Sequence, residues 1–227
     1  MIDFHSHILP GVDHGAASLD VSVEMLKQAK KAGVATIVAT PHFYLHRDSL
    51  DSFLERRNKA YSVLKDYLAK DSSIGIDVVC GAEVALESKL LTLDLKKLAI
   101  EGTNSILIEM PMFGAWHSWM FHMLYEIESR FSLNVILAHV DRYGKENCAR
   151  LLDMGFTAQI NAEALVRGSF FQKRRFMNLC REGAVHLIGS DAHDTKERSY
   201  DDLILLSKKA SSDLLEYFDL NAKDVLK

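Results

Sequence analysis

Short apolar runs rich in β-branched residues alternate along this chain with longer stretches whose apolar residues repeat at helical spacing. The short runs predict buried parallel strands, at 1–5, 34–39, 76–80, 105–109, 134–138, 156–160 and 185–189. The longer stretches predict helices at 18–32, 50–69, 117–131, 145–154, 170–182 and 199–210, with a terminal helix or cap at 213–227. Because no Pro/Gly/Ser-rich linker interrupts the alternation, we expect one α/β domain over residues 1–227.

Two architectures fit this alternation of strands and helices. A β/α barrel is the more economical prediction for a chain of this length, and a doubly wound open sheet is the competitor. Periodicity alone does not separate the two, because buried parallel strands have the same apolar pattern in both. Ser18 is a plausible N-cap for the first helix, and Gly33 follows its predicted end.

Composition excludes several classes of protein. The chain has 227 residues and a formal net charge of -4, which does not predict a broad basic surface for nucleic acid. No apolar run is long enough to cross a membrane, and the first ten residues lack the basic region of a signal peptide. The three cysteines, Cys80, Cys148 and Cys180, are scattered, which is typical of a reducing compartment. We therefore expect a cytoplasmic protein.

Polar side chains follow every predicted strand at the point where it ends. They are His5 and His7, Thr40-Pro41-His42, Gly81-Ala82-Glu83, Glu109, His139 with Asp141-Arg142, Asn161, and Ser190-Asp191-Ala192-His193. The carboxyl ends of parallel barrel strands share one face, where catalytic groups gather. We expect these side chains to meet there.

A shared metal is the simplest partner for such a set. Buried imidazoles and carboxylates cost free energy unless something pairs with them. Alternate residues of a strand point to one side, so His5 and His7 project together, and Asp191 and His193 share that spacing. Any one of these residues could instead be a hydrogen-bonded structural side chain, and the joint pattern is what favours a metal site. Mixed nitrogen and oxygen ligands suit zinc, iron or manganese.

Seven ordered stretches spanning positions 3 to 193 resemble the PHP (polymerase and histidinol phosphatase) family, and more closely the bacterial PHP-type protein-tyrosine phosphatases encoded with capsule and exopolysaccharide genes. The stretches are DFHSHILPGVDHG, TIVATPHF, CGAE, LIEMP, VILAHVDRY, TAQIN and LIGSDAH. The resemblance implies a distorted (β/α)7 TIM-like barrel that holds two or three divalent metal ions, manganese first, with iron or zinc as alternatives.

The resemblance also implies roles for single residues. Arg142 would hold the substrate phosphate, and His42 or His193 could protonate the leaving group. Glu109 would bridge two ions, and His42 would serve a third metal position. The implied ligands as a set are His5, His7, Glu83, Glu109, His139, Asp191 and His193.

The stretch before Gly15 departs from the pattern of the PHP-type tyrosine phosphatases that this sequence resembles. Two aspartates usually precede the glycine there, and the second is a ligand of the third metal; this chain has Val12-Asp13-His14-Gly15. We therefore consider three arrangements in order: His14 is the ligand, Asp13 serves instead, or the third site is empty. The segment FGAWHSWMFH, around Trp116 and His122, is either a substrate wall or the start of an amphipathic helix.

The sequence thus predicts a metal-dependent phosphatase that uses an activated water. The resemblance implies a phosphotyrosine protein as substrate, namely a bacterial tyrosine kinase of a polysaccharide export system, with no nucleic acid or membrane insertion; an oligomer is compatible with the sequence. The alternatives are a phosphatase or phosphodiesterase of a small metabolite such as histidinol phosphate, and an inactive metal-binding regulatory barrel. No cysteine is followed by arginine six residues later, which excludes a cysteine phosphatase loop, and no P-loop motif occurs.

Overall fold

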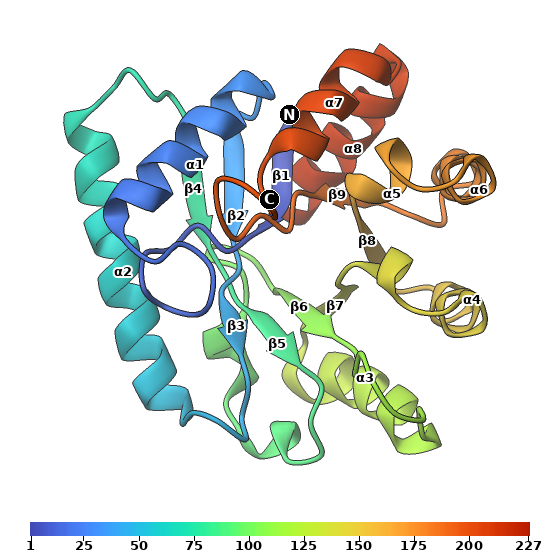
Figure 1. The fold of residues 1–227 in the computed structure, drawn as a ribbon. Coiled ribbons are helices and arrows are strands. Elements are labelled where there is room, and N and C mark those ends of the chain that lie inside the picture. The colour runs from blue at the N-terminus through green and yellow to red at the C-terminus, as the bar shows by residue number, and fades with distance from the viewer.

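The computed structural model describes residues 1–227 and has an α/β fold, with parallel strands curling through the centre and helices around them (Figure 1). The strands are β1 (Ile2–Ser6), β2 (Thr36–Ala39), β3 (His42–Phe43), β4 (Asp77–Cys80), β5 (Glu83–Ala85), β6 (Ser105–Glu109), β7 (Asn134–Leu137), β8 (Thr157–Asn161) and β9 (Leu187–Gly189). The helices are α1 (Leu19–Lys31), α2 (Leu50–Lys70), α3 (Ser118–Phe131), α4 (Lys145–Asp153), α5 (Glu163–Val166), α6 (Phe170–Arg181), α7 (Asp201–Lys209) and α8 (Ser212–Val225).

All seven predicted strands and all seven predicted helices are present, with ends that differ by a few residues. The short strands β3 and β5 were not predicted from the sequence. They follow β2 and β4 after breaks of two residues. The first break contains Pro41, which has no N–H to donate to a strand ladder. Asn161 lies inside β8 rather than after it. As a result, His42 and Glu83 are the first residues of short strands, and Asn161 is the last residue of β8.

The strands form two parallel sections. One has the order β1-β2-β4 and the other β3-β5-β6-β7-β8-β9. A bridge between Ser6 and Ala192 links β1 to the end of β9, so the sections curl into one structure. Neighbours follow chain order throughout, whereas a doubly wound sheet reverses its order near the middle. The structure therefore has a curled parallel sheet rather than a doubly wound one.

Apolar side chains cover both faces of the sheet. Along β6, Ile106 and Ile108 pack into a large core cluster, whereas Leu107 between them belongs to a smaller one. This double burial explains why the strands are continuous apolar runs. Ser18 caps α1 by accepting a hydrogen bond from the N–H of Val21, as the sequence predicts. None of the helices combines the length and the hydropathy of a membrane-crossing segment.

Candidate metal centre

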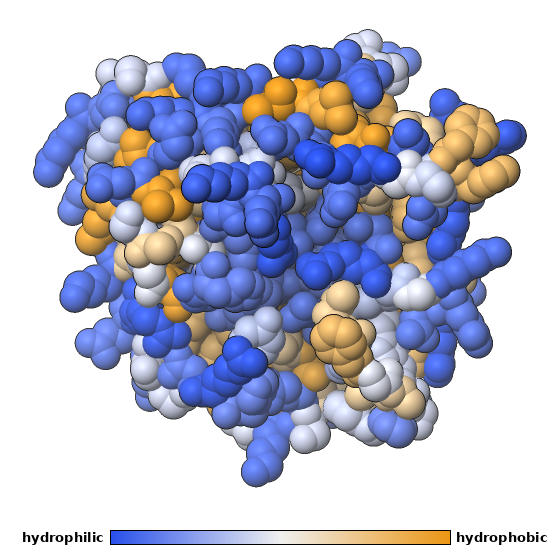
Figure 2. Space-filling view, in the orientation of Figure 1, coloured by the Kyte–Doolittle hydropathy of each residue, from blue (hydrophilic) through white to orange (hydrophobic).

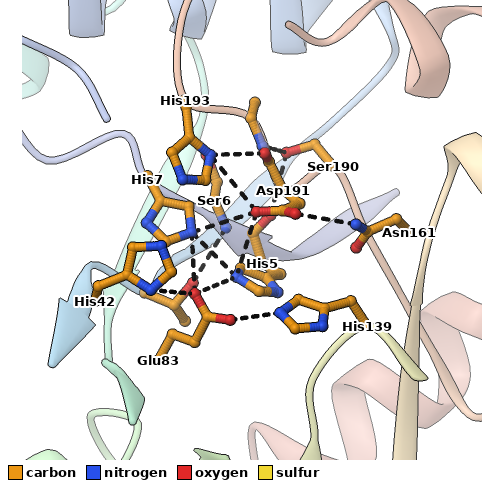
Figure 3. Close-up of polar contacts among 12 residues, drawn as sticks. His5, Ser6, His7, His42, Glu83, His139, Asn161, Ser190, Asp191 and His193 are labelled. Carbon is orange, nitrogen blue, oxygen red and sulfur yellow. Dashed lines mark hydrogen bonds and ion pairs between the residues drawn. The ribbon is translucent and has the colours of Figure 1, made fainter. Parts of the chain in front are cut away.

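Glu83 lies at the middle of a cluster of imidazoles at the carboxyl ends of the strands (Figure 3). Its Oε1 is 2.6 Å from His139 Nε2. Its Oε2 is 2.8 Å from His42 Nδ1, 3.2 Å from His5 Nε2 and 3.3 Å from His7 Nε2. The carboxylate is fully buried, and these four histidines are its only ion-pair partners. One carboxylate thus joins residues from four strands or strand ends.

Asp191 forms the other anionic side of the cluster. Its Oδ1 is 3.4 Å from His7 Nε2 and 3.5 Å from His193 Nδ1. Its Oδ2 accepts from Asn161 Nδ2 at 3.0 Å. Two guanidinium groups also reach this oxygen, from Arg142 at 3.0 Å and Arg198 at 2.8 Å. Asp191 therefore lies between the histidines and two permanent positive charges.

The backbone is strained where two of these residues leave their strands. His139 has φ 31° and Asp191 has φ 52°, which lie in the left-handed region that favours glycine. Such strain persists when the surroundings hold it, and it gathers at functional sites. Gly189 allows a related close approach, because a Cβ there would lie 2.6 Å from His5 Cβ. The backbone at His139 and Asp191 thus keeps a strained conformation that directs their side chains toward the cluster.

Hydrogen bonds to Nδ1 orient three imidazoles of the cluster. His7 Nδ1 donates to Asp13 Oδ2 at 2.7 Å, and His193 Nδ1 donates to the Asp191 carbonyl at 2.9 Å. His5 Nδ1 lies 3.1 Å from Gln159 Oε1, which also accepts from the His139 N–H at 2.7 Å. The Nε2 atom of each ring is then the one left to bind a metal, which it would do in its deprotonated form.

The lone pairs and unpaired atoms of the cluster fit bound cations. His5 Nε2 and His7 Nε2 face each other at 3.2 Å, and two nitrogens that share one ion lie about 3 Å apart. Three of the four buried side-chain atoms without a hydrogen-bond partner are here: Glu83 Oε2, His139 Nδ1 and His193 Nε2. The ligand atoms lie within 4.8 Å of one another in three groups: His5-His7-Glu83, His7-His42-His193 and His42-Glu83-Glu109. This donor set suits manganese, iron or zinc.

The cluster keeps its central carboxylates ionised. Burial would raise the pKa of Glu83, but His5 and His42 outweigh it and hold that pKa well below the usual range. The pKa of Asp191 is also well below its usual range, because hydrogen bonding to His7 and the charge of His5 outweigh burial. Burial, together with the charge of Glu83, raises the pKa of Glu109 to about 7. Two fixed negative charges thus remain available to cations at neutral pH.

The structure brings together all but one of the residues predicted as ligands. Glu109 joins through its Oε1, 3.6 Å from His139 Nε2. His14 is in none of the three groups: it is exposed at the mouth, and its ring stacks on His42 with centroids 4.7 Å apart and packs against His193 at 4.5 Å. Both carboxylate oxygens of Asp13 are already occupied by hydrogen bonds within the protein. They accept from His7 Nδ1 and from the N–H groups of His42 and Gly15.

The Trp/His segment forms the end of a loop and the first turn of α3. His117 is the N-cap residue, and Trp116 Nε1 donates to the Pro111 carbonyl at 2.8 Å. The Trp116 ring packs edge-on against Tyr143, with centroids 5.1 Å apart. The helix start is therefore confirmed, since α3 begins at Ser118 within this segment, and the substrate wall stays a prediction.

Two residues of the site, Gln159 and Arg198, were not predicted from the sequence, and a third, Asp13, has contacts that the sequence did not show. Gln159 is a polar residue in the middle of a buried strand, which was a signal in TAQIN. Arg198, which pairs with Asp191, follows the last strand by nine positions and carries no motif. Asp13 orients His7 and the loop of His42 instead of facing the cluster centre. The partners of Gln159 are distant in sequence, whereas Arg198 and Asp13 meet nearby residues through the path of a loop, so only the folded chain shows these contacts.

Comparison with known proteins places the chain in a family. The family described as capsular polysaccharide synthesis, CpsB/CapC, matches residues 1–226. The tyrosine-protein phosphatase YwqE of Bacillus subtilis is 30% identical over 241 residues, which cover 100% of this chain and 92% of YwqE. The tyrosine-protein phosphatase CpsB of Streptococcus agalactiae is 27% identical over 221 residues, 87% of this chain and 85% of CpsB.

A solved structure agrees with these relatives. It comes from crystal structures of YwqE and of Streptococcus pneumoniae CpsB, described as unique metal-dependent tyrosine phosphatases. It is similar to this fold with a TM-score of 0.82 and 27% sequence identity, covering 100% of this chain and 94% of the other. The curled sheet, the cluster of histidines and carboxylates and these matches lead to one conclusion: the chain belongs to the CpsB/CapC family of capsular polysaccharide synthesis.

Proposed function

We propose that this protein is a metal-dependent phosphatase that hydrolyses phosphotyrosine on a protein. The observation that carries the proposal is the convergence of five imidazoles and three carboxylates on one buried centre, with Arg142 at its edge. The CpsB/CapC relatives, named as tyrosine-protein phosphatases, support the choice of substrate. We further propose that the curled sheet is the distorted (β/α)7 barrel of the PHP fold.

The proposed centre holds two or three divalent ions, manganese first, with iron or zinc as alternatives. Bound ions would supply an attacking hydroxide by lowering the pKa of a water, and would neutralise charge on the phosphoryl oxygens. The ligands proposed for two ions are His5, His7, Glu83, Glu109, His139 and Asp191. His42 and His193 would hold a third, joined by His14 from the mouth.

The chain's own side chains complete the proposed reaction. Arg142 and Arg198 both contact Asp191 Oδ2, and the Arg142 side chain is partly exposed, so its remaining N–H donors would be available to a phosphate. A guanidinium binds phosphate through a fork of two N–H donors and keeps its charge at any working pH. His42 or His193 would donate a proton to the leaving phenolate oxygen. Phenolate leaves readily, so this proton transfer contributes little to the rate.

The cysteines argue against the alternative covalent route to the same reaction. All three are buried and free. Burial raises the pKa of Cys80 to about 11 and that of Cys180 to about 12, so neither is a thiolate at neutral pH. Free buried thiols also suit a reducing compartment, which supports a proposed cytoplasmic location. The substrate proposed there is a tyrosine kinase of the polysaccharide export system.

Hydrolysis of phosphopeptides tests the proposal. Matched peptides carrying phosphotyrosine or phosphoserine are incubated with the protein, with Mn²⁺ added or with EDTA, and p-nitrophenyl phosphate and histidinol phosphate are compared. We expect phosphate release from phosphotyrosine that needs metal and that survives replacement of all three cysteines by serine. Absence of metal-dependent release contradicts the proposal, and a higher kcat/KM on histidinol phosphate than on the peptide indicates a metabolite phosphatase.

A further inference from the structure

A groove of about 560 Å³ adjoins the metal centre on the side of His42. Its walls come from the loop after β1, from β3, from the segment between β3 and α2, and from α2. They are Val12, Asp13, His14, His42, Tyr44, Arg47, Asp48 and Arg56. Hydrophilic residues dominate the middle of this face of the molecule (Figure 2). Because His42 belongs to both the groove and the centre, a substrate whose phosphate lies among the metal ligands has room to extend into the groove.

The groove contains two guanidinium groups in different states. Arg56 is already paired: its Nη2 lies 2.5 Å from Asp48 Oδ2 and its Nε donates to the Val12 carbonyl at 3.0 Å. Arg47 has no carboxylate within ion-pair distance. Its Nε donates to His46 Nε2 at 3.2 Å, and the side chain is exposed. The chain as a whole is mildly acidic, so a free positive charge beside the centre needs an explanation.

Arg47 is held in place beside the centre by Tyr44. Its guanidinium lies over the Tyr44 ring, 5.0 Å from the centroid, in a cation–π contact. The Tyr44 hydroxyl lies 3.0 Å from His42 Nδ1. The stacked ring shields one face of the guanidinium and leaves its Nη groups for an incoming anion. This geometry differs from that of Arg142 and Arg198, which both contact a carboxylate of the site.

We propose that Arg47 binds an anionic side chain next to the phosphotyrosine, so that the groove selects acidic phosphopeptides. The inference rests on the proposed phosphatase function and names the substrate class of that same site. The anion can be the carboxylate of Asp or Glu, or a second phosphate, because a guanidinium pairs with both through the same fork of N–H donors. Peptides that carry each group distinguish the two sources.

The test compares phosphotyrosine peptides of one length that differ only in their flanking residues. The flanks are Asp and Glu, their amides Asn and Gln, or a phosphoserine. The variants are Arg47→Gln and Arg47→Lys, with Arg181→Gln as the matched control. Arg181 is an exposed arginine at the end of α6, near the start of β9 and so at the opposite end of the strand from the metal centre.

We expect the unaltered protein to bind and hydrolyse the acidic peptide with a KM about fivefold below that for the amide peptide, the range of an exposed charged pair. Arg47→Gln abolishes this preference through KM rather than kcat, Arg47→Lys keeps part of it, and Arg181→Gln keeps all of it. Fluorescence anisotropy with non-hydrolysable phosphonate peptides gives the same order. A lower KM for the phosphoserine peptide alone identifies phosphate as the partner of Arg47. An equally low KM for the phosphoserine and the Asp/Glu peptides means that either anion can bind.

Three results would overturn the inference while leaving the phosphatase proposal intact. The first is equal KM for acidic and amide peptides in the unaltered protein. The second is an equal loss of preference in Arg47→Gln and Arg181→Gln, which indicates general charge attraction. The third is a fall in kcat on p-nitrophenyl phosphate that matches the loss on the acidic peptide, which indicates that Arg47 only supports Tyr44 and His42. Absence of phosphate release from every phosphotyrosine peptide overturns both proposals together.

Discussion

The floor and the mouth of the site are built differently. At the floor, His5, Glu83 and His139 are at most 1% exposed, and hydrogen bonds from Gln159 and the strand ends hold them. At the mouth, His14 is exposed and only stacks on His42 and His193. The floor is therefore preorganised before any ion binds, whereas the mouth has room to adjust. The departure from the subfamily pattern at His14 is at the mouth, where an exchange of side chain costs the fold least.

The difference extends to charge. Glu83 and Asp191 bring negative charge to the inner part of the centre, whereas imidazoles alone form the outer group His7-His42-His193. A neutral ligand set attracts a divalent ion less strongly than one with carboxylates. A third ion at the mouth should therefore bind more weakly than the ions at the floor. Ranking the variants by their effect tests this comparison.

The largest expected effect comes from Glu83→Gln at the floor. The amide keeps the shape but removes the charge that four histidines share, so the ions lose a common ligand. We expect kcat/KM to fall by about 10³-fold, because a metal supplies several kcal/mol of transition-state stabilisation. Metal analysis of the purified protein should show a parallel loss of bound ions. Glu87→Gln, which removes the surface partner of His46, is the control and should retain activity.

An intermediate effect is expected from Gln159→Leu beneath the floor. This change removes the acceptor shared by His5 Nδ1 and the backbone N–H of His139, so the His5 imidazole loses its orientation and the backbone that carries His139 loses a hydrogen bond. We expect metal affinity to fall by about 10- to 100-fold, as for other groups that orient metal ligands. Ile160→Val, on the neighbouring position of β8, should lower the unfolding temperature without changing titrated metal affinity. Equal affinity in the two variants would mean that Gln159 serves packing alone.

The smallest effect is expected from His14→Ala at the mouth. If His14 is the third ligand, this variant binds one metal ion fewer, and kcat/KM falls by about tenfold. His14→Asp should recover the ion and raise its affinity, because the carboxylate adds negative charge. Calorimetric titration with Mn²⁺ counts the ions. An unchanged count of three in His14→Ala would transfer the role to Asp13, and a count of two in the unaltered protein would indicate that the third site is empty.

The strands and helices were predictable because each has a local cause. Buried runs such as Ile106 to Ile108 are apolar on both faces, and Ser18 caps the first helix within its own turn. The short strands β3 and β5 were not predictable in the same way. Each has only two or three residues, and it is a strand only because a neighbouring section of the sheet accepts its hydrogen bonds. The β-propensity of two or three residues is too weak a signal to predict a strand.

The sequence by itself determined which chemical groups this protein brings to the ends of its strands. They are histidines at alternate positions, single carboxylates and the arginine that follows β7. Only the tertiary structure decided how they pair, because the paths of the strands and loops set which side chains meet, whether they are near or far apart in the chain. Gln159 meets His5, Asp13 turns to His7, and Arg198 reaches Asp191 after the sheet has curled. Local patterns record which residues are present, whereas distances between ligands follow from the packing of the whole sheet.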